Sequence, residues 1–212
     1  MKRDEHRRLR RLGGGCALLA LLATGARAED EAERILALLD VRPGATVADV
    51  GAGDGEWTLA LADAVGAEGS VYATEVTEGL LESIRRRVAE AGVTNVRVVA
   101  GDQGATGLPS ACCDGILLRL VYHHFVDPEA MRADLGRALR SGGRVLVVET
   151  RPQSGWRKLE DVPERGGHGI APAALVAEMA RSGLREVERR ERWNGDDDRY
   201  AVLFERETGP SR

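Results

Sequence analysis

A glycine-rich loop flanked by carboxylates follows the first strand pattern of the chain. The strand pattern covers residues 46–50, Asp49 lies two residues before Gly51, and Gly53 and Gly55 complete a G-x-G-x-G spacing. Glycine lets the backbone turn sharply and approach a ligand closely, and a helix start offers free N–H groups. Because any tight strand-to-helix turn can also be rich in glycine, the loop alone does not establish a site.

Further polar side chains follow the next two strand patterns. Glu75 ends the second pattern, and Asp102 with Gln103 follows the third. A carboxylate at the first of these places can accept hydrogen bonds from both ribose hydroxyls, and Asp102 with Gln103 can reach an adenine amino group. Since ligands of open α/β sheets bind at the carboxyl ends of strands, these residues predict a nucleoside site. The glycine spacing differs from the G-x-G-x-x-G of dinucleotide folds.

Histidines follow the fourth strand pattern and recur in a later loop, at His123, His124 and His168. Imidazole titrates near neutrality, so His123 or His124 is a candidate base for a hydroxyl or amine acceptor. The alternative for this pair is a histidine at a helix start that hydrogen-bonds to backbone. His168 could enter the site from the loop after the fifth strand, and its alternative is a loop residue without a role in the site. Because adjacent side chains diverge in a helix-opening turn, we expect at most one of the pair to face the ligand, and favour His124.

These residues need a scaffold, which the alternation of strand and helix patterns supplies. We expect five strands, at 46–50, 70–74, 95–100, 114–120 and 144–149. We expect four helices, at 32–39, 56–65, 77–91 and 128–139. Such alternation predicts right-handed βαβ units in a doubly wound α/β fold with a parallel sheet. After a polar loop, a helix at 172–182 precedes two strands, at 184–192 and 199–206, whose Asn194-Gly195 link indicates a hairpin.

Together, the loop, the acids and the strands resemble the Rossmann-like, class I S-adenosylmethionine-dependent methyltransferases from about Ile35 to Glu149. Residues 47–55 resemble the first motif of that family, and residues 100–102 its adenine-side motif. Residues 113–119 and 139–149 resemble its fourth and fifth strands. The resemblance implies a seven-stranded sheet, mostly parallel with a C-terminal antiparallel hairpin, and S-adenosylmethionine as cofactor.

The resemblance also implies roles for individual residues. Gly51, Gly53 and Gly55 would shape the loop beneath the methionine part of the cofactor, and Asp49 would face its amino group. Glu75 would hold the ribose. Asp102 and Gln103 would border the adenine, and Arg119 would lie near the methionine end. For Arg119 a surface ion pair is the alternative.

The implied activity is methyl transfer to an unidentified small-molecule acceptor. An Asn-Pro-Pro-Tyr signature, typical of amide and adenine N-methylation, is absent after the fourth strand, and residues 119–125 resemble small-molecule members of the family. Two alternatives stay open: a non-catalytic ligand-binding protein on the same fold, and a nicotinamide-dependent oxidoreductase, which the glycine spacing disfavours.

Composition fits one soluble globular domain, with 212 residues, 43% apolar and 30% charged. These values exclude a disordered tract, a collagen-like fibre and a multi-span membrane protein. The formal net charge of −4 becomes −9 without residues 1–28, which carry seven basic and two acidic side chains. Because a negative domain repels phosphate backbones, we expect no nucleic-acid partner. The oligomeric state is left open.

Residues 1–28 have the order of a secretory signal peptide, with a basic region, an apolar run at 16–23 and Ala26-Arg27-Ala28. The apolar run is shorter than the roughly 20 residues of a membrane-spanning helix. We therefore expect an exported or periplasmic protein, either cleaved after Ala28 to leave a methyltransferase domain at 29–212, or held by an N-terminal anchor. A cytoplasmic protein with a basic tail is the alternative.

The cysteines add little to this picture. Cys16 lies in the apolar run, and Cys112 and Cys113 are adjacent. Neighbouring Cα atoms are too close for relaxed disulfide geometry, so we expect these two to stay unpaired. With neither a disulfide framework nor zinc-type spacing, the sequence predicts no metal and gives export no support.

Overall fold

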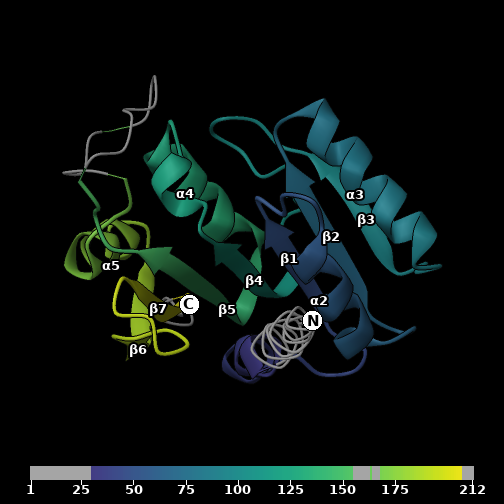
Figure 1. The fold of residues 1–212 in the computed structure, drawn as a ribbon, viewed down its shortest axis with the longest axis horizontal. Coiled ribbons are helices and arrows are strands. Elements are labelled where there is room, and N and C mark those ends of the chain that lie inside the picture. The colour runs from purple at the N-terminus through teal and green to yellow at the C-terminus, as the bar shows by residue number, and fades with distance from the viewer. Residues whose placement is uncertain (1–29, 155–162, 164–167, 207–212) are drawn as a thin grey trace, which may run out of the picture.

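The computed structural model describes residues 30–154, 163 and 168–206, which form a seven-stranded sheet in the order β3-β2-β1-β4-β5-β7-β6 (Figure 1). A helix covers residues 30–39. The elements that follow are β1 (Thr46–Val50), α2 (Glu56–Val65), β2 (Ser70–Glu75), α3 (Glu78–Glu90), β3 (Val96–Ala100), β4 (Cys113–Arg119), the 3₁₀ helix η1 (Tyr122–His124), α4 (Pro128–Ala138), β5 (Leu139–Thr150), α5 (Pro172–Ala180), β6 (Leu184–Arg190) and β7 (Arg199–Arg206).

Strands β1 to β5 pair in parallel, and β7 pairs antiparallel with both β5 and β6. This arrangement confirms the doubly wound, mostly parallel sheet with a C-terminal antiparallel hairpin. From β1 the chain first builds outward to β2 and β3, then crosses to β4 and β5 on the other side. The strand order therefore reverses between β1 and β4, which is where open α/β sheets bind ligands.

Alternating side chains of the central strands pack against helices on both faces of the sheet. Ala48 and Val50 join a core with Leu135 of α4 and Leu175 of α5. Val47, the residue before Ala48, faces the helix 30–39 and α2 on the other side of the sheet. Fully burying one such leucine contributes about 1.5–3 kcal/mol. The two cores hold the carboxyl ends of β1, β2 and β4 in fixed relative positions.

Strand β5 starts earlier than the pattern predicts. Residues 141–143 read as a turn after the preceding helix, but β5 already begins at Leu139, where it pairs with Cys113. A register shift between Cys113 and Gly115 and a positive φ of 75° at Gly142 let the strand continue through these residues.

The two adjacent cysteines are paired, so the expectation that they stay free is wrong. Cys112 and Cys113 form a disulfide with their Cα atoms 3.7 Å apart. That separation lies below the common range of about 4.4–6.8 Å, but neighbouring residues can still close a ring through their sulfurs. Both side chains are buried where the chain enters β4.

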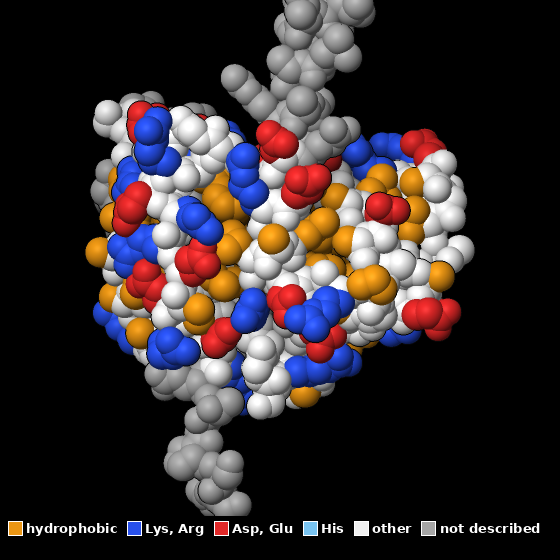
Figure 2. All heavy atoms as spheres, turned by 90° about the horizontal axis from the view of Figure 1, so that it is seen from below, with side chains coloured by type: hydrophobic (Ala, Val, Ile, Leu, Met, Phe, Trp, Pro, Cys, Tyr) orange, Lys and Arg blue, Asp and Glu red, His pale blue; other side chains and the backbone are white. Residues whose placement is uncertain are grey.

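The predicted signal peptide or anchor at 1–28 lies outside the described residues and stays a prediction. Among the described residues, none of the helices combines the length and apolar character needed to span a bilayer. On the face seen in Figure 2, blue basic and red acidic side chains are intermixed around orange apolar ones. The charges on this face are therefore interspersed rather than gathered into a region of one sign.

Candidate active site

The glycine loop after β1 has left-handed backbone at three positions, with φ of 70° at Gly51, 60° at Gly53 and 84° at Gly55. A Cβ on Gly51 would lie 2.4 Å from Val121 Cγ2, so this glycine permits close packing against the segment after β4. A Cβ on Gly53 would meet nothing within 4 Å. The loop therefore packs tightly at its first glycine and leaves open space at its second.

Strand β2 holds this loop in place through backbone and side-chain hydrogen bonds. Gly51 N and Ala52 N both donate to Thr74 O, over 3.0 and 3.1 Å. Gly53 N donates to Glu75 Oε1 over 2.9 Å, and Val76 N donates to the other oxygen of that carboxylate. Glu75 is thus oriented by two N–H groups and lies directly beside the open side of the loop.

A cavity of about 190 Å³ lies at the carboxyl ends of β1, β2 and β3, beneath η1. It brings together five of the predicted site residues: Gly51, Glu75, Asp102, Gln103 and His124. Much of the remaining lining is apolar, from Val50, Val76, Val121, Phe125, Val126 and Met131. Carboxylates at one side and an apolar wall at the other suit a ligand with a polar sugar and a flat apolar ring.

A larger open hollow, of about 800 Å³, lies between the helix 30–39 and the segment 188–195. Its lining contains none of the predicted site residues. The candidate site is therefore the smaller cavity at the strand ends.

Asp102 shapes the loop that follows β3. Its Oδ1 accepts hydrogen bonds from Gly104 N and Ala105 N, over 2.8 and 2.7 Å. Behind it, Thr106 donates to Asp134 of α4 through both its backbone N and its hydroxyl. These bonds fix the edge of the cavity that Asp102 and Gln103 form.

Asp49 is buried beneath the glycine loop, with 2% of its surface exposed. Thr58 Oγ1 of α2 donates to Asp49 Oδ2 over 2.7 Å. Burial raises the pKa of Asp49 to about 6, although the hydrogen bond from Thr58 opposes that shift. The carboxyl can therefore take or release a proton close to neutral pH, and a cationic group nearby would favour its ionised form.

Arg119 ends β4 in an ion pair, the alternative that the sequence left open. Its Nε donates to Glu31 Oε1 over 2.9 Å, and its guanidinium lies 4.6 Å from the ring centroid of Trp57. The same Glu31 oxygen accepts from Trp193 Nε1 over 2.8 Å. The lining of the cavity does not include Arg119, so its role near the methionine end stays a prediction.

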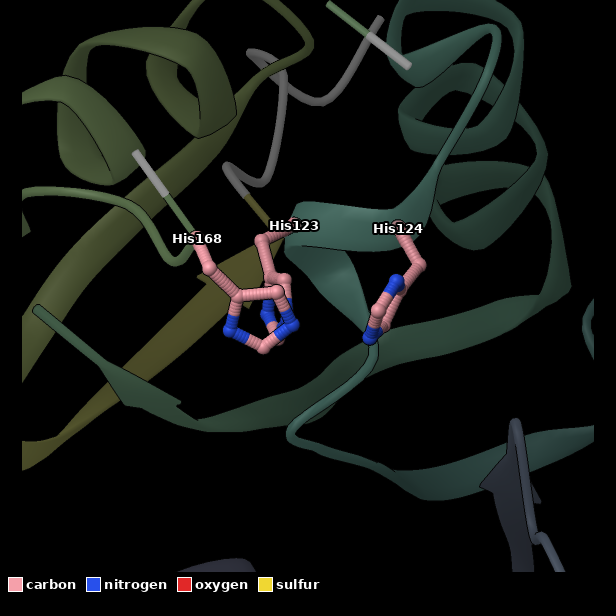
Figure 3. A group of neighbouring side chains, drawn as sticks. All are labelled: His123, His124 and His168. Atoms are coloured by element: carbon pink, nitrogen blue, oxygen red, sulfur yellow. The ribbon is translucent and has the colours of Figure 1, made fainter. Parts of the chain in front are cut away.

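The three histidines lie close together beside the cavity, and the rings of His123 and His124 are nearer to each other than expected for diverging side chains. Their ring centroids lie 4.0 Å apart, and the ring of His168 lies 4.3 Å from that of His123 (Figure 3). Leu120, just before the pair, has a φ of 57°, and the two histidines follow in the 3₁₀ turn η1. His124 is the histidine that lines the cavity, as favoured from the sequence.

Each histidine has a different environment. His123 is buried, with Nδ1 2.8 Å from Glu149 Oε2 and Nε2 3.1 Å from His168 Nε2. His124 is the more exposed of the pair. Burial and the neighbouring imidazoles of His123 and His168 lower the pKa of His124 to about 4. At neutral pH His124 is therefore uncharged and free to accept a proton, as a weak base.

Glu149 is a site residue that the sequence reasoning did not single out. It ends an apolar run in β5, is fully buried, and accepts hydrogen bonds from His123 N and Thr150 N besides its contact with the His123 ring. Its only signal in the sequence was a carboxylate near the carboxyl end of a central strand. The structure gives it the task of orienting His123.

The approach of His168 depends on the residue that follows it. Gly169 has a φ of 115°, and a Cβ there would lie 2.6 Å from Thr150 O. Backbone hydrogen bonds between His168 and Gln153 hold the same segment against the end of β5. A glycine at this position therefore brings the loop close enough for His168 to reach His123.

The comparisons with known proteins agree with this geometry. A family model described as a methyltransferase domain matches residues 47–143. A demethylmenaquinone methyltransferase of Shouchella clausii is 32% identical over 112 residues, which are 53% of this chain and 48% of that protein. Nocamycin O-methyltransferase of Saccharothrix syringae is 32% identical over 149 residues, which are 69% of this chain and 53% of that protein.

The chain thus spans about half the length of these curated relatives. Among solved structures, a SAM-dependent methyltransferase from Aquifex aeolicus has the same fold, with a TM-score of 0.68 at 22% identity, covering 82% of this chain and 88% of that one. The glycine loop, the acids at the strand ends, the strand order and the matching family model lead to one assignment: residues 47–143 form a methyltransferase domain of the class I, S-adenosylmethionine-dependent kind.

Proposed function

We propose that this chain transfers a methyl group from S-adenosylmethionine to a small-molecule acceptor at the cavity between β1, β2, β3 and η1. One observation carries the proposal: a single cavity at the switch in strand order is lined both by Glu75, Asp102 and Gln103 and by His124. A cofactor-binding side and an acceptor side therefore border the same space.

The residues present fit the cofactor. The open space at Gly53 and the carboxylate of Glu75 would receive the ribose and the chain attached to it, since a Cβ at Gly53 meets no protein atom within 4 Å. The apolar wall would receive the adenine, with Asp102 and Gln103 at its edge. Asp49, beneath the loop, would supply negative charge for the amino group.

The size of the cavity indicates which part of the cofactor it would hold. About 190 Å³ is below the roughly 300–1,000 Å³ of typical ligand sites. We therefore expect it to hold the nucleoside part, with the methionine part nearer Gly51 and Asp49.

When bound, the cofactor supplies an electrophilic methyl carbon on a sulfonium. Transfer of that methyl group to the acceptor atom would leave the C–S electron pair on sulfur and so release S-adenosylhomocysteine. The protein's main contribution is alignment of the two reactants. His124, at the cavity rim, is the side chain placed to take the acceptor's proton.

The small-molecule nature of the acceptor is supported by the relatives, whose names include a quinone-type and an O-methylated acceptor. The matches reported above are methyltransferases, and they lend no support to a nicotinamide-dependent oxidoreductase.

The test is transfer of label from methyl-labelled S-adenosylmethionine to a panel of quinols, phenols, enols and amines. We expect label in at least one organic product, with S-adenosylhomocysteine formed in equal amount. Glu78→Ala, three residues beyond Glu75 and at the exposed start of α3, is the matched control and should retain the wild-type rate. Binding of S-adenosylhomocysteine without transfer to any acceptor would instead favour a non-catalytic binding protein.

A further inference from the structure

Three of the four histidines of the chain meet at one point, although His123 and His168 are 45 residues apart. One ring nitrogen from each of His123, His124 and His168 lies within 4.8 Å of the others, and Figure 3 shows the rings together, His123 and His124 from η1 and His168 from the loop before α5. We propose that these three imidazoles bind a divalent transition-metal ion of the zinc class.

The spacing of the nitrogens is close to what such an ion requires. In a tetrahedral site with Zn–N distances of about 2.0–2.1 Å, two ligating nitrogens are about 3.3–3.4 Å apart. His123 Nε2 and His168 Nε2 are 3.1 Å apart, so a small movement would admit the ion between them. His124 is the more exposed side chain, so its ring can rotate to complete the set.

The tautomer of His123 is also the one that a metal ligand needs. Nδ1 lies 2.8 Å from the Glu149 carboxylate, so this nitrogen carries the proton and Nε2 presents its lone pair to the cluster. Glu149 is itself fixed by His123 N and Thr150 N. A carboxylate behind a histidine is the arrangement that orients metal-ligating imidazoles and raises their basicity.

The packing around η1 holds the backbone that carries the cluster in place. Tyr122, the residue before the pair, donates its hydroxyl proton to Glu178 of α5 over 2.7 Å, and Arg132 of α4 bonds to both. On the other side, the close approach of Gly169 to Thr150 sets the position of His168. Ligands held in place before binding lose little conformational entropy when the ion arrives.

A simple hydrogen bond between His123 and His168 would explain the contact of those two rings. That bond would leave the ring of His124, 4.0 Å from that of His123, outside the contact, whereas a bound ion would use all three rings.

The donor set indicates the class of ion and its use. Three imidazoles suit zinc, copper, nickel or iron, whereas magnesium and calcium prefer oxygen ligands. Three protein ligands with an open fourth position are typical of catalytic zinc sites. Because His124 also lines the cavity, we expect the open position to receive the hydroxyl or thiol of the methyl acceptor, a consequence that rests on the proposed function.

In that case the ion, rather than a free imidazole, ionises the acceptor. The coordinated hydroxyl or thiol releases its proton to solvent, and the resulting anion forms the new bond to the methyl carbon while the C–S electron pair stays on sulfur. Removing the metal would then slow transfer to ionisable acceptors without changing the affinity for S-adenosylhomocysteine.

The experiment is a zinc titration of the full chain after chelation and dialysis, read by competition with a chromogenic chelator, with cobalt absorption as a second readout. We expect one ion per chain and tetrahedral-type cobalt bands. His123→Ala and His168→Gln should each lower the zinc affinity more than about 100-fold, and Glu149→Gln should lower it roughly 10- to 100-fold. His6→Ala, which removes the remaining histidine, should match the wild type.

Two results would overturn the site: wild-type protein with a folded circular dichroism spectrum that binds no zinc, or folded His168→Gln protein that keeps the wild-type affinity. A parallel titration with S-adenosylhomocysteine separates this proposal from the proposed function. Zinc binding without S-adenosylhomocysteine binding would reject the latter and keep the metal site, and the opposite pair of results would reject the metal site alone.

Discussion

The two sides of the cavity are built in different ways. The cofactor side consists of backbone loops and carboxylates within the two consecutive βαβ units from β1 to β3, and in the first of them Gly51, Ala52 and Gly53 bond to Thr74 and Glu75. The histidine side is a cluster of which His124 alone lines the cavity, and it is formed by side chains from η1, β5 and the loop before α5, which are far apart in the sequence. A local unit can therefore be recognised from spacing, whereas a cluster of distant side chains has to be seen in the structure.

Replacement of His124 should give the largest effect, and it should affect the histidine side without affecting the cofactor side. We expect His124→Ala to lower turnover roughly 10²- to 10⁴-fold, whether the imidazole acts as base or as metal ligand, because the acceptor then lacks help in losing its proton. Its affinity for S-adenosylhomocysteine should change little. Steady-state kinetics with an acceptor found in the panel, together with calorimetry, measure both quantities. Equal loss of rate and of affinity would mean a structural histidine, and full activity would mean that alignment alone drives transfer.

Replacement of Glu75 should affect the opposite side. We expect Glu75→Ala to weaken cofactor binding by about 1.5–3 kcal/mol, roughly 10- to 150-fold, because the ribose hydroxyls lose a charged acceptor. Calorimetry with S-adenosylhomocysteine measures the change, with Glu78→Ala as the control. Unchanged affinity in Glu75→Ala would remove this residue from the site.

Two glycines with similar backbone angles and open surroundings allow the cost of backbone strain to be distinguished from the loss of contact with the cofactor. Gly53 has a φ of 60° and Gly92, after α3, a φ of 66°, and a Cβ on either would meet no atom within 4 Å. Alanine at each should lower the free energy of unfolding by about 1–2 kcal/mol, because left-handed backbone disfavours a Cβ.

Only Gly53→Ala should also weaken S-adenosylhomocysteine binding, by about tenfold, because only this Cβ enters the space assigned to the cofactor. Denaturant unfolding and calorimetry on both variants give the comparison. A bulkier Gly53→Val should abolish binding while the domain stays folded. Normal binding by Gly53→Val would mean that the loop has another purpose.

The pH dependence of cofactor binding should report on Asp49. The folded-state pKa of Asp49, about 6, is raised by burial, so the free protein holds a proton there below that pH. If the ionised form pairs with the amino group of the cofactor, affinity should rise with pH up to about 6 and then level off, by roughly tenfold between pH 5 and 7. Asp49→Asn should bind more weakly and show no such rise. A flat profile in the wild type would place the amino group elsewhere.

Much of the fold was predictable because buried parallel strands and amphipathic helices leave periodic patterns. β1, α2 and β7 have the predicted bounds, at Thr46–Val50, Glu56–Val65 and Arg199–Arg206. The start of β5 was missed because Ser141, Gly142 and Gly143 read as a turn, while a register shift in the pairing with β4 keeps them in the strand.

The site was predictable on the side where spacing determines position. Glu75, Asp102 and Gln103 line one cavity at the strand ends, and their roles toward the cofactor stay predictions. The partner of Arg119 was not predictable, because Glu31 is 88 residues away and reaches it through the packing of the helix 30–39. The histidine cluster was not predictable either, because no periodic pattern in the sequence indicates the path of the loop after β5. Glu149 was missed because it looks like the polar end of an apolar strand.

Calorimetric titration of the wild-type chain with S-adenosylhomocysteine, and separately with a nicotinamide dinucleotide, tests the central claim that the cavity at the β1–β4 switch binds the methyl donor. We predict one site per chain for S-adenosylhomocysteine and no binding of the dinucleotide. The dissociation constant should be roughly 1 μM to 1 mM, which is the range of the Michaelis constants of enzymes for their substrates. Folded protein that binds the dinucleotide, or that binds neither compound, would contradict it.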